Sequence, residues 1–225
     1  MIGFYDYTVI VTYLSLVISA FGMMQAIEGN FTPAIVCLAL SGLCDMFDGK
    51  IARSKKNRTD DEKLFGVQID SLCDVICFGA FPGMLCYLLG VRTPIGLIGI
   101  AYYFVCSVIR LAYFNVLETN RQQVEEGANK YYHGLPITTM AIILPLVYFV
   151  QLAVPGLVFL LILKIMLFLV GTLFVVDFKL KKPDNKTLTM IVIIVGIAVA
   201  LIVLLPRLSE VRFEFPKKIR WPFIK

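Results

Sequence analysis

The chain has 225 residues, of which 59% are hydrophobic and only 16% are charged. A soluble domain of this size cannot bury so much apolar surface, and several apolar runs reach the roughly 20 residues that cross a bilayer as a helix. Strict alternation of apolar and polar residues is absent, which argues against an outer-membrane barrel. The net charge of +5 is small and lies between the apolar runs, so we expect membrane lipids as partners and no nucleic acid.

Seven apolar segments follow one another, and the predicted fold class is an all-α integral membrane protein. The segments are about Thr8–Ala26, Thr32–Gly49, Gly66–Gly90, Pro94–Val116, Leu135–Leu152, Gly156–Val176 and Leu188–Leu205. Basic residues crowd the second, fourth and sixth connectors, whereas the other three hold only Arg92. The positive-inside bias therefore predicts a multi-pass protein of the cell membrane whose amino terminus and even connectors face the cytoplasm.

The tail after Pro206 conflicts with this topology. Seven crossings from a cytoplasmic start place it outside, yet it contains six basic residues. Either the last apolar segment does not cross fully, or the tail is a positively charged exterior segment, and the sequence leaves both interpretations open.

The six cysteines all fall inside apolar segments, and none forms a C-x-x-C pair. We interpret them as small packing residues and not as a disulfide framework. Three of them lie close in sequence to acidic residues, which leaves a soft-metal site as the less favoured alternative: Cys44, Cys73 and Cys77.

Four aspartates stand where the second segment ends and the third begins: Asp45, Asp48, Asp70 and Asp74. Spacings of three and four residues place both members of each pair on one side of a helix. Four carboxylates converging between two apolar helices would repel one another unless a cation neutralised them. An ordinary interfacial role is disfavoured because one aspartate inside a membrane helix costs about 2.5–3.5 kcal/mol. The sequence therefore predicts a divalent-metal site, and an all-oxygen ligand set suits Mg²⁺ or Mn²⁺.

Small and basic residues accompany the aspartates at helical spacing. Gly49 and Ala52 share the stripe of the first pair, and Gly66 shares the stripe of the second. Glycines in these places would let a ligand approach the backbone closely. Arg53 lies one turn beyond Gly49, where it could pair with a phosphate oxygen.

The pattern D-x2-D-G-x2-A-R … G-x3-D-x3-D, from Asp45 to Asp74, resembles the signature of the CDP-alcohol phosphotransferases. The resemblance implies a six-helix membrane core, here with a seventh carboxy-terminal helix, that transfers a substituted phosphate from a CDP-linked donor to an alcohol and releases CMP. It implies that the four aspartates share two divalent cations, Mn²⁺ or Mg²⁺, and that Asp74 is also the general base. The smaller residues and the arginine would line the CDP moiety. The stretch Ser54–Phe65 is longer than the usual family gap, but a longer polar loop adds little closure entropy.

Further stretches resemble the phosphatidylserine synthase branch of that family: IDSLCDVICFGAFPGML, RLAYFN and HGLPIT. This resemblance implies transfer of the phosphatidyl group of CDP-diacylglycerol to L-serine, and a homodimer. The positive-inside bias places the aspartates, and with them the active site, at the cytoplasmic face. Residues 1–176 would form the catalytic core, and residues 177–225 a connector, the additional helix and a basic tail. Another acceptor (glycerol 3-phosphate or an inositol phosphate) and, from a different class, a metal-ion carrier are the alternatives.

Four single residues receive separate interpretations. Arg110, about one turn from the expected end of its segment, either snorkels to the interface or holds the donor phosphate or the serine carboxylate. Asn115 either assists it or caps the helix. His133 is interpreted as ordering its loop, and Lys164 as facing a dimer groove or a lipid headgroup.

Overall fold

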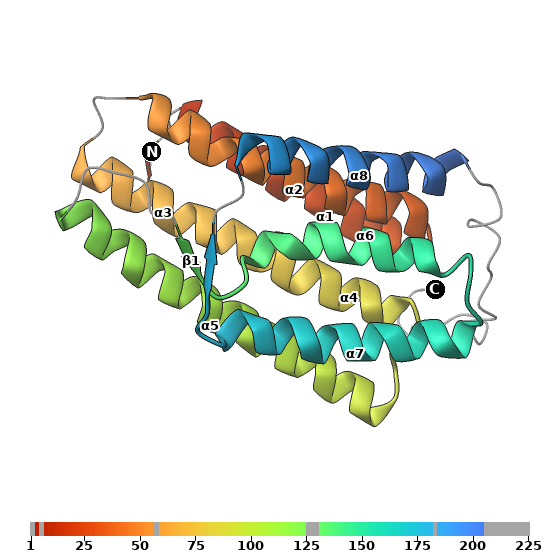
Figure 1. The fold of residues 1–225 in the computed structure, drawn as a ribbon. Coiled ribbons are helices and arrows are strands. Elements are labelled where there is room, and N and C mark those ends of the chain that lie inside the picture. Colours follow the sequence, from red (N-terminus) through yellow and green to blue (C-terminus); the bar gives the residue numbers. More distant parts are fainter. Residues whose placement is uncertain (1–2, 5–6, 56–58, 125–130, 182–183, 205–225) are drawn as a thin grey trace, which may run out of the picture.

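The computed structural model describes residues 3–4, 7–55, 59–124, 131–181 and 184–204, which form a bundle of long helices (Figure 1). The main helices are α1 (Ile10–Ile27), α2 (Phe31–Ser54), α3 (Asp60–Asp74), α4 (Phe81–Leu88), α5 (Pro94–Val124), α6 (Met140–Val150), α7 (Gly156–Val175) and α8 (Asn185–Leu204). Short helical turns lie before α1 (η1, Tyr7–Val9), between α3 and α4 (η2, Val75–Ala80) and before α6 (η3, Ile137–Thr139). Because η2 is a π-helical turn that links α3 directly to α4, these elements make one continuous segment.

The predicted all-α membrane fold is confirmed. Within the described residues, six helical segments are long and apolar enough to cross a membrane, and the segment Ile137–Val150 is a shorter apolar helix. The six cysteines are all free, as expected of packing residues. The tail lies outside the described residues, and the boundary between residues 176 and 177 stays a prediction.

Two helices extend beyond the apolar segments that the sequence predicts. α3 begins at Asp60 and not near Gly66, because Thr59 and Glu62 form a reciprocal cap: Thr59 Oγ1 accepts from the Glu62 amide, and Glu62 Oε2 accepts from the Thr59 amide. α5 continues to Val124, well past the last apolar residues. The end of α2, the start of α3 and the end of α5 gather at one end of the bundle, on the left of Figure 1. We call this the polar end.

Small residues allow close contact between helices at several points, as is common in membrane bundles. A Cβ added at Gly42 of α2 would lie 2.4 Å from Cβ of Ala141 in α6, and one added at Gly83 of α4 would lie 2.2 Å from the ring of Phe104. Large side chains with almost no exposure fill the centre of the bundle: Phe78, Phe81, Tyr103, Leu144 and Phe159.

One pair of short strands departs from the helical pattern. β1 (Tyr131–His133) pairs antiparallel with β2 (Lys179–Lys181), with His133 opposite Lys179. Gly134 follows at φ +73°, and its amide donates to the carbonyl of Phe178 at 2.8 Å. A residue with a side chain is strained at this φ, and a Cβ would also lie 3.1 Å from the Val176 carbonyl oxygen. The loop before α6 is therefore attached to the segment that follows α7.

Gly42→Ala is expected to lower the free energy of unfolding by about 1–3 kcal/mol, because the added methyl group overpacks the α2–α6 contact. Thermal unfolding of the detergent-solubilised protein measures the change. Gly196→Ala in α8 is the matched control, since no atom lies within 4 Å of a Cβ there. Equal stability of the two variants would contradict the packing described for Gly42.

Candidate active site

Three of the four aspartates meet between α2 and α3. One carboxylate oxygen from each of Asp45, Asp70 and Asp74 lies within 4.8 Å of the other two. The four-residue spacing of Asp70 and Asp74 turns both toward α2, which supplies Asp45 from its carboxy-terminal half. Oxygens at this separation surround a space of the size that a divalent cation occupies. We call these three residues the carboxylate trio.

Asp48 lies beside the trio. It follows Asp45 by three residues in α2, so both carboxyl groups lie on the same side of that helix. Its Oδ2 also accepts a hydrogen bond from Oγ1 of Thr12 in α1 at 3.3 Å. The structure thus brings all four predicted aspartates into one neighbourhood, three of them converging and the fourth held next to them.

The chemistry of this neighbourhood fits a divalent cation. Asp48 and Asp74 are buried, with 8% and 9% of their surface exposed. Oδ1 of Asp70 is buried and has no hydrogen-bond partner in the described part of the chain, so it is available to a metal. Adjacent buried carboxylates without a cation repel one another and lose hydration. The converging group contains only oxygen ligands, so it favours Mg²⁺ or Mn²⁺ over a soft metal.

The residues predicted to line the CDP moiety border the trio along the same helices. Gly49 lies one turn from Asp45 in α2, and Gly66 lies one turn before Asp70 in α3. Ala52 and Arg53 belong to the last turn of α2, and their side chains are outside the described part of the structure. Their contact with a nucleotide stays a prediction.

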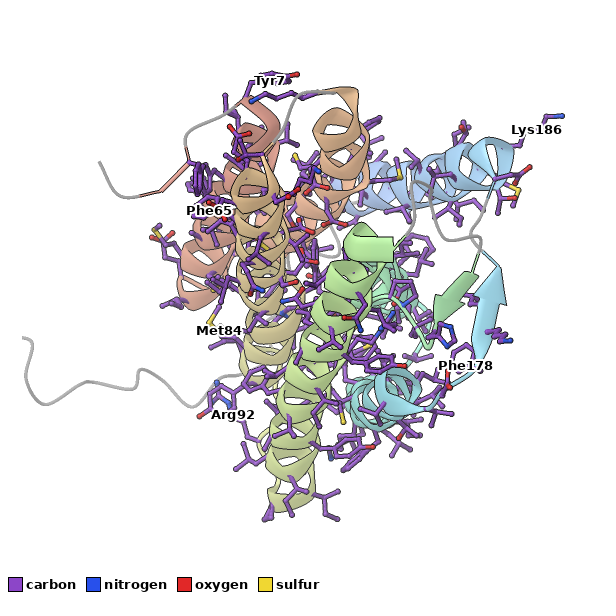
Figure 2. All side chains as sticks on the ribbon, turned by 90° about the vertical axis from the view of Figure 1, so that its left-hand side faces the viewer. Tyr7, Phe65, Met84, Arg92, Phe178 and Lys186 are labelled. Carbon is purple, nitrogen blue, oxygen red and sulfur yellow. The ribbon has the colours of Figure 1, made fainter. Side chains whose placement is uncertain are left out.

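The amino-terminal residues reach the same end of the bundle. The rings of Phe4 and Phe65 are 5.6 Å apart and meet edge to face. Figure 2 looks along the bundle from the polar end and shows Tyr7 and Phe65 on one side of it, with Lys186 on the other. The start of α3 is therefore covered by residues that precede α1.

Arg110 lies deeper than the sequence predicts. Because α5 runs to Val124, Arg110 is about four turns from the end of the helix and not one. It is only 5% exposed, and its Nε donates to the carbonyl of Leu135 at 2.9 Å. The interpretation of Arg110 as a side chain that snorkels to the interface is therefore wrong. A buried guanidinium held along one edge is instead suited to binding an anion.

The depth of Arg110 follows from its neighbours in α5. Ser107 packs against Gly79 of η2, with its Cβ 3.4 Å from the position of a glycine Cβ. Further toward the polar end, Asn115 contacts Ser71 of α3. Since α5 runs antiparallel to the α3–η2–α4 segment, Arg110 lies between these two contacts, near the start of η2.

Asn115 is not a helix cap, because it lies nine residues inside α5. Its Oδ1 accepts from Ser71 Oγ, and its Nδ2 donates to Gln68 Oε1 at 3.5 Å. Ser71 directly follows Asp70, so these bonds fix the rotation of the helix that carries two of the trio. No local pattern in the sequence indicates Ser71 or Gln68, since their partner is more than 40 positions away.

The two remaining residues lie away from the trio. His133 Nδ1 is 3.0 Å from Asp177 Oδ1, a contact that joins β1 to the segment after α7. Lys164 is partly exposed in the middle of α7. Its expected place in a dimer groove or at a lipid headgroup stays a prediction.

The fold and the site define a multi-pass helical membrane protein with a cluster of aspartates near one end of its bundle. The chain belongs to the CDP-alcohol phosphatidyltransferase family, whose model matches residues 8–176. The predicted family resemblance is thereby confirmed.

Several relatives are similar to this chain. The CDP-diacylglycerol–serine O-phosphatidyltransferase of Saccharomyces cerevisiae is 35% identical over 123 residues, which is 53% of this chain and 42% of the relative. The archaetidylserine synthase of Methanothermobacter thermautotrophicus is 35% identical over 131 residues, 58% of this chain and 49% of the relative. The CDP-diacylglycerol–serine O-phosphatidyltransferase of Methanocaldococcus jannaschii is 30% identical over 165 residues, 73% of this chain and 70% of the relative. The matched region spans less than half of the yeast and Methanothermobacter relatives.

Proposed function

We propose that this protein transfers the phosphatidyl group of CDP-diacylglycerol to the hydroxyl of L-serine, giving phosphatidylserine and CMP. The observation that carries the proposal is the carboxylate trio, placed between α2 and α3 by the family motif. Serine appears in the name of each of the three relatives, which supports serine as the acceptor.

In the proposed reaction the serine oxygen attacks the phosphorus that carries the diacylglycerol. A new P–O bond forms to serine, the P–O bond to CMP breaks, and the hydroxyl proton passes to Asp74. A hydroxyl is a poor nucleophile at neutral pH, so a positioned carboxylate base is needed. Asp74 is suited to this task because it is one of the three converging carboxylates and has only 9% of its surface exposed.

Asp45, Asp48, Asp70 and Asp74 would hold the two divalent cations, Mg²⁺ or Mn²⁺. Such cations, when bound, neutralise a pyrophosphate and stabilise charge on the transferring phosphoryl and leaving groups. Gly49, Ala52, Arg53 and Gly66 would accommodate the CDP moiety at the polar end.

Arg110 would bind the carboxylate of serine. The cations already offset the charge of the donor pyrophosphate, so the acceptor carboxylate is the anion left to be paired. Its guanidinium is held by the Leu135 carbonyl and has the planar arrangement of N–H donors that pairs with carboxylates. Asn115 supports this side of the site by holding α5 against α3.

We place the site at the cytoplasmic face of the cell membrane, from the charge of the even connectors. The donor would reach it from the bilayer and serine from the water. A homodimer is part of the proposal on the strength of the family resemblance. The name of the Methanothermobacter relative makes an archaetidyl donor the second candidate for the lipid substrate.

The proposal predicts CMP release that requires L-serine. Purified protein in detergent is incubated with CDP-diacylglycerol and Mn²⁺, and CMP is measured with L-serine, glycerol 3-phosphate or inositol phosphate as the acceptor. We expect release with L-serine alone, its loss on adding EDTA, and its return when Mn²⁺ is restored in excess. Release with glycerol 3-phosphate but not with L-serine would overturn the acceptor. A parallel reaction with an archaeal ether-lipid donor decides between the two lipid substrates.

A further inference from the structure

α1 presents one polar face to the bundle. Its buried residues are Thr12, Ser15, Ser19, Gly22 and Ala26. They recur every three or four positions and therefore share one side of the helix. Large apolar side chains on the other sides are exposed, among them Leu14, Val17 and Phe21. The hydroxyl groups of α1 are thus turned away from the lipid and toward α2 and η2.

Two of these hydroxyl groups have different partners. Thr12 Oγ1 donates to the Asp48 carboxylate at 3.3 Å, and the two residues are 5% and 8% exposed. Ser15, one turn further along α1, donates to the backbone carbonyl of Ser41 at 3.1 Å. Ser15 therefore joins two helices, whereas Thr12 contacts a residue of the acidic cluster directly.

The direction of the Thr12 hydroxyl is informative. A threonine in a membrane helix can satisfy its hydroxyl on a carbonyl of its own helix four residues back. Here the hydroxyl reaches Asp48, 36 positions away in α2. Asp48 follows Asp45 of the carboxylate trio by three residues, on the same side of α2. A donor on one Asp48 oxygen restrains the rotation of its carboxyl group.

We propose that Thr12 is a positioning residue of the metal centre, whose hydroxyl orients Asp48 for binding a divalent cation. α1 is then a third helix that contributes to the site, in addition to the two helices that carry the aspartates. Residues that hold a metal ligand in place commonly change metal affinity by about 10–100-fold when they are replaced. The inference rests on the cation binding included in the proposed function.

The test is Mn²⁺ binding by the full-length protein in detergent without substrates, measured from the electron paramagnetic resonance signal of free Mn²⁺. Thr12→Val keeps the size and branching of the side chain and removes only the donor. We expect it to weaken Mn²⁺ binding about tenfold. Thr12→Ser, which retains a hydroxyl, is expected to bind close to the native level. Thr12→Ala, a second variant without the donor, is expected to match Thr12→Val.

Ser15→Ala is the matched control, because it removes a hydroxyl from the same face of α1 whose contacts are the Ser41 carbonyl and, at 3.8 Å, Sγ of Cys77. Its Mn²⁺ affinity is expected to equal that of the native protein. Native affinity in both Thr12→Val and Thr12→Ala would overturn the role of Thr12, as would an equal loss in Ser15→Ala. Absence of Mn²⁺ binding by the native protein would instead overturn the metal centre of the proposed function, and this inference with it.

Discussion

Asp74→Asn is expected to reduce serine-dependent CMP release by about 10²–10⁴-fold, the range that a general base contributes. The substitution keeps the size and shape of the side chain but removes the carboxylate that would accept the serine proton. It also removes one of the three negative charges that converge at the α2–α3 contact. Initial rates at saturating CDP-diacylglycerol, L-serine and Mn²⁺ measure the effect.

Asp60→Asn is the control, because it makes the same substitution in the same helix at a side chain that is 98% exposed. We expect native activity from it, since surface substitutions of this kind have small effects. Mn²⁺ binding by Asp74→Asn should be measured alongside. If Asp74→Asn retains full activity, Asp74 is not the base.

Arg110→Gln is expected to raise the KM for L-serine about 10–100-fold, while the KM for CDP-diacylglycerol stays near its native value. Hydrogen bonds to charged groups contribute about 1.5–3 kcal/mol, and each 1.4 kcal/mol is about tenfold in affinity. Arg110→Lys should be intermediate, because an ammonium group keeps the charge but lacks the planar fork. Steady-state kinetics with each substrate varied separately distinguish the two KM values.

Arg92→Gln supplies the matched control. Arg92 lies in the connector between α4 and α5, where its guanidinium stacks 5.1 Å from the centre of the Tyr87 ring. Its replacement should leave both KM values unchanged. A rise in the KM for CDP-diacylglycerol and not for L-serine in Arg110→Gln would assign Arg110 to the donor phosphate.

Hydropathy was sufficient to predict the helical segments, because the burial of apolar side chains in lipid dominates their placement. Hydropathy could not predict where α3 begins or where α5 ends. The cap made by Thr59 and Glu62 lies outside the apolar run, so α3 starts earlier than the apolar pattern indicates. The same limitation placed Arg110 too close to the end of its helix.

The aspartates could be predicted because helical spacing and a charge in an apolar run are local properties of the sequence. The residues that hold them could not. Thr12 contacts Asp48 across 36 positions, and Asn115 contacts Ser71, next to Asp70, across 44 positions. Hydroxyl and amide side chains are common in membrane helices without such a role. The pairing of β1 with β2 was also missed, because strands of three residues are too short to show alternation.

The π-helical turn Val75–Ala80 begins directly after Asp74. The number of residues in this turn therefore determines how α3 and α4 are rotated relative to each other. Its wider winding allows the acidic residues of α3 and the core residues of α4 to face their separate neighbours along one continuous segment. Loss of one residue there would turn the two halves by about 100° relative to each other, since an α-helix has 3.6 residues per turn. The connector between α2 and α3 is subject to no such limit, because additional residues there change only the span of a loop. Insertions and deletions should therefore be tolerated in the connector between α2 and α3 but not in the π-helical turn that follows Asp74.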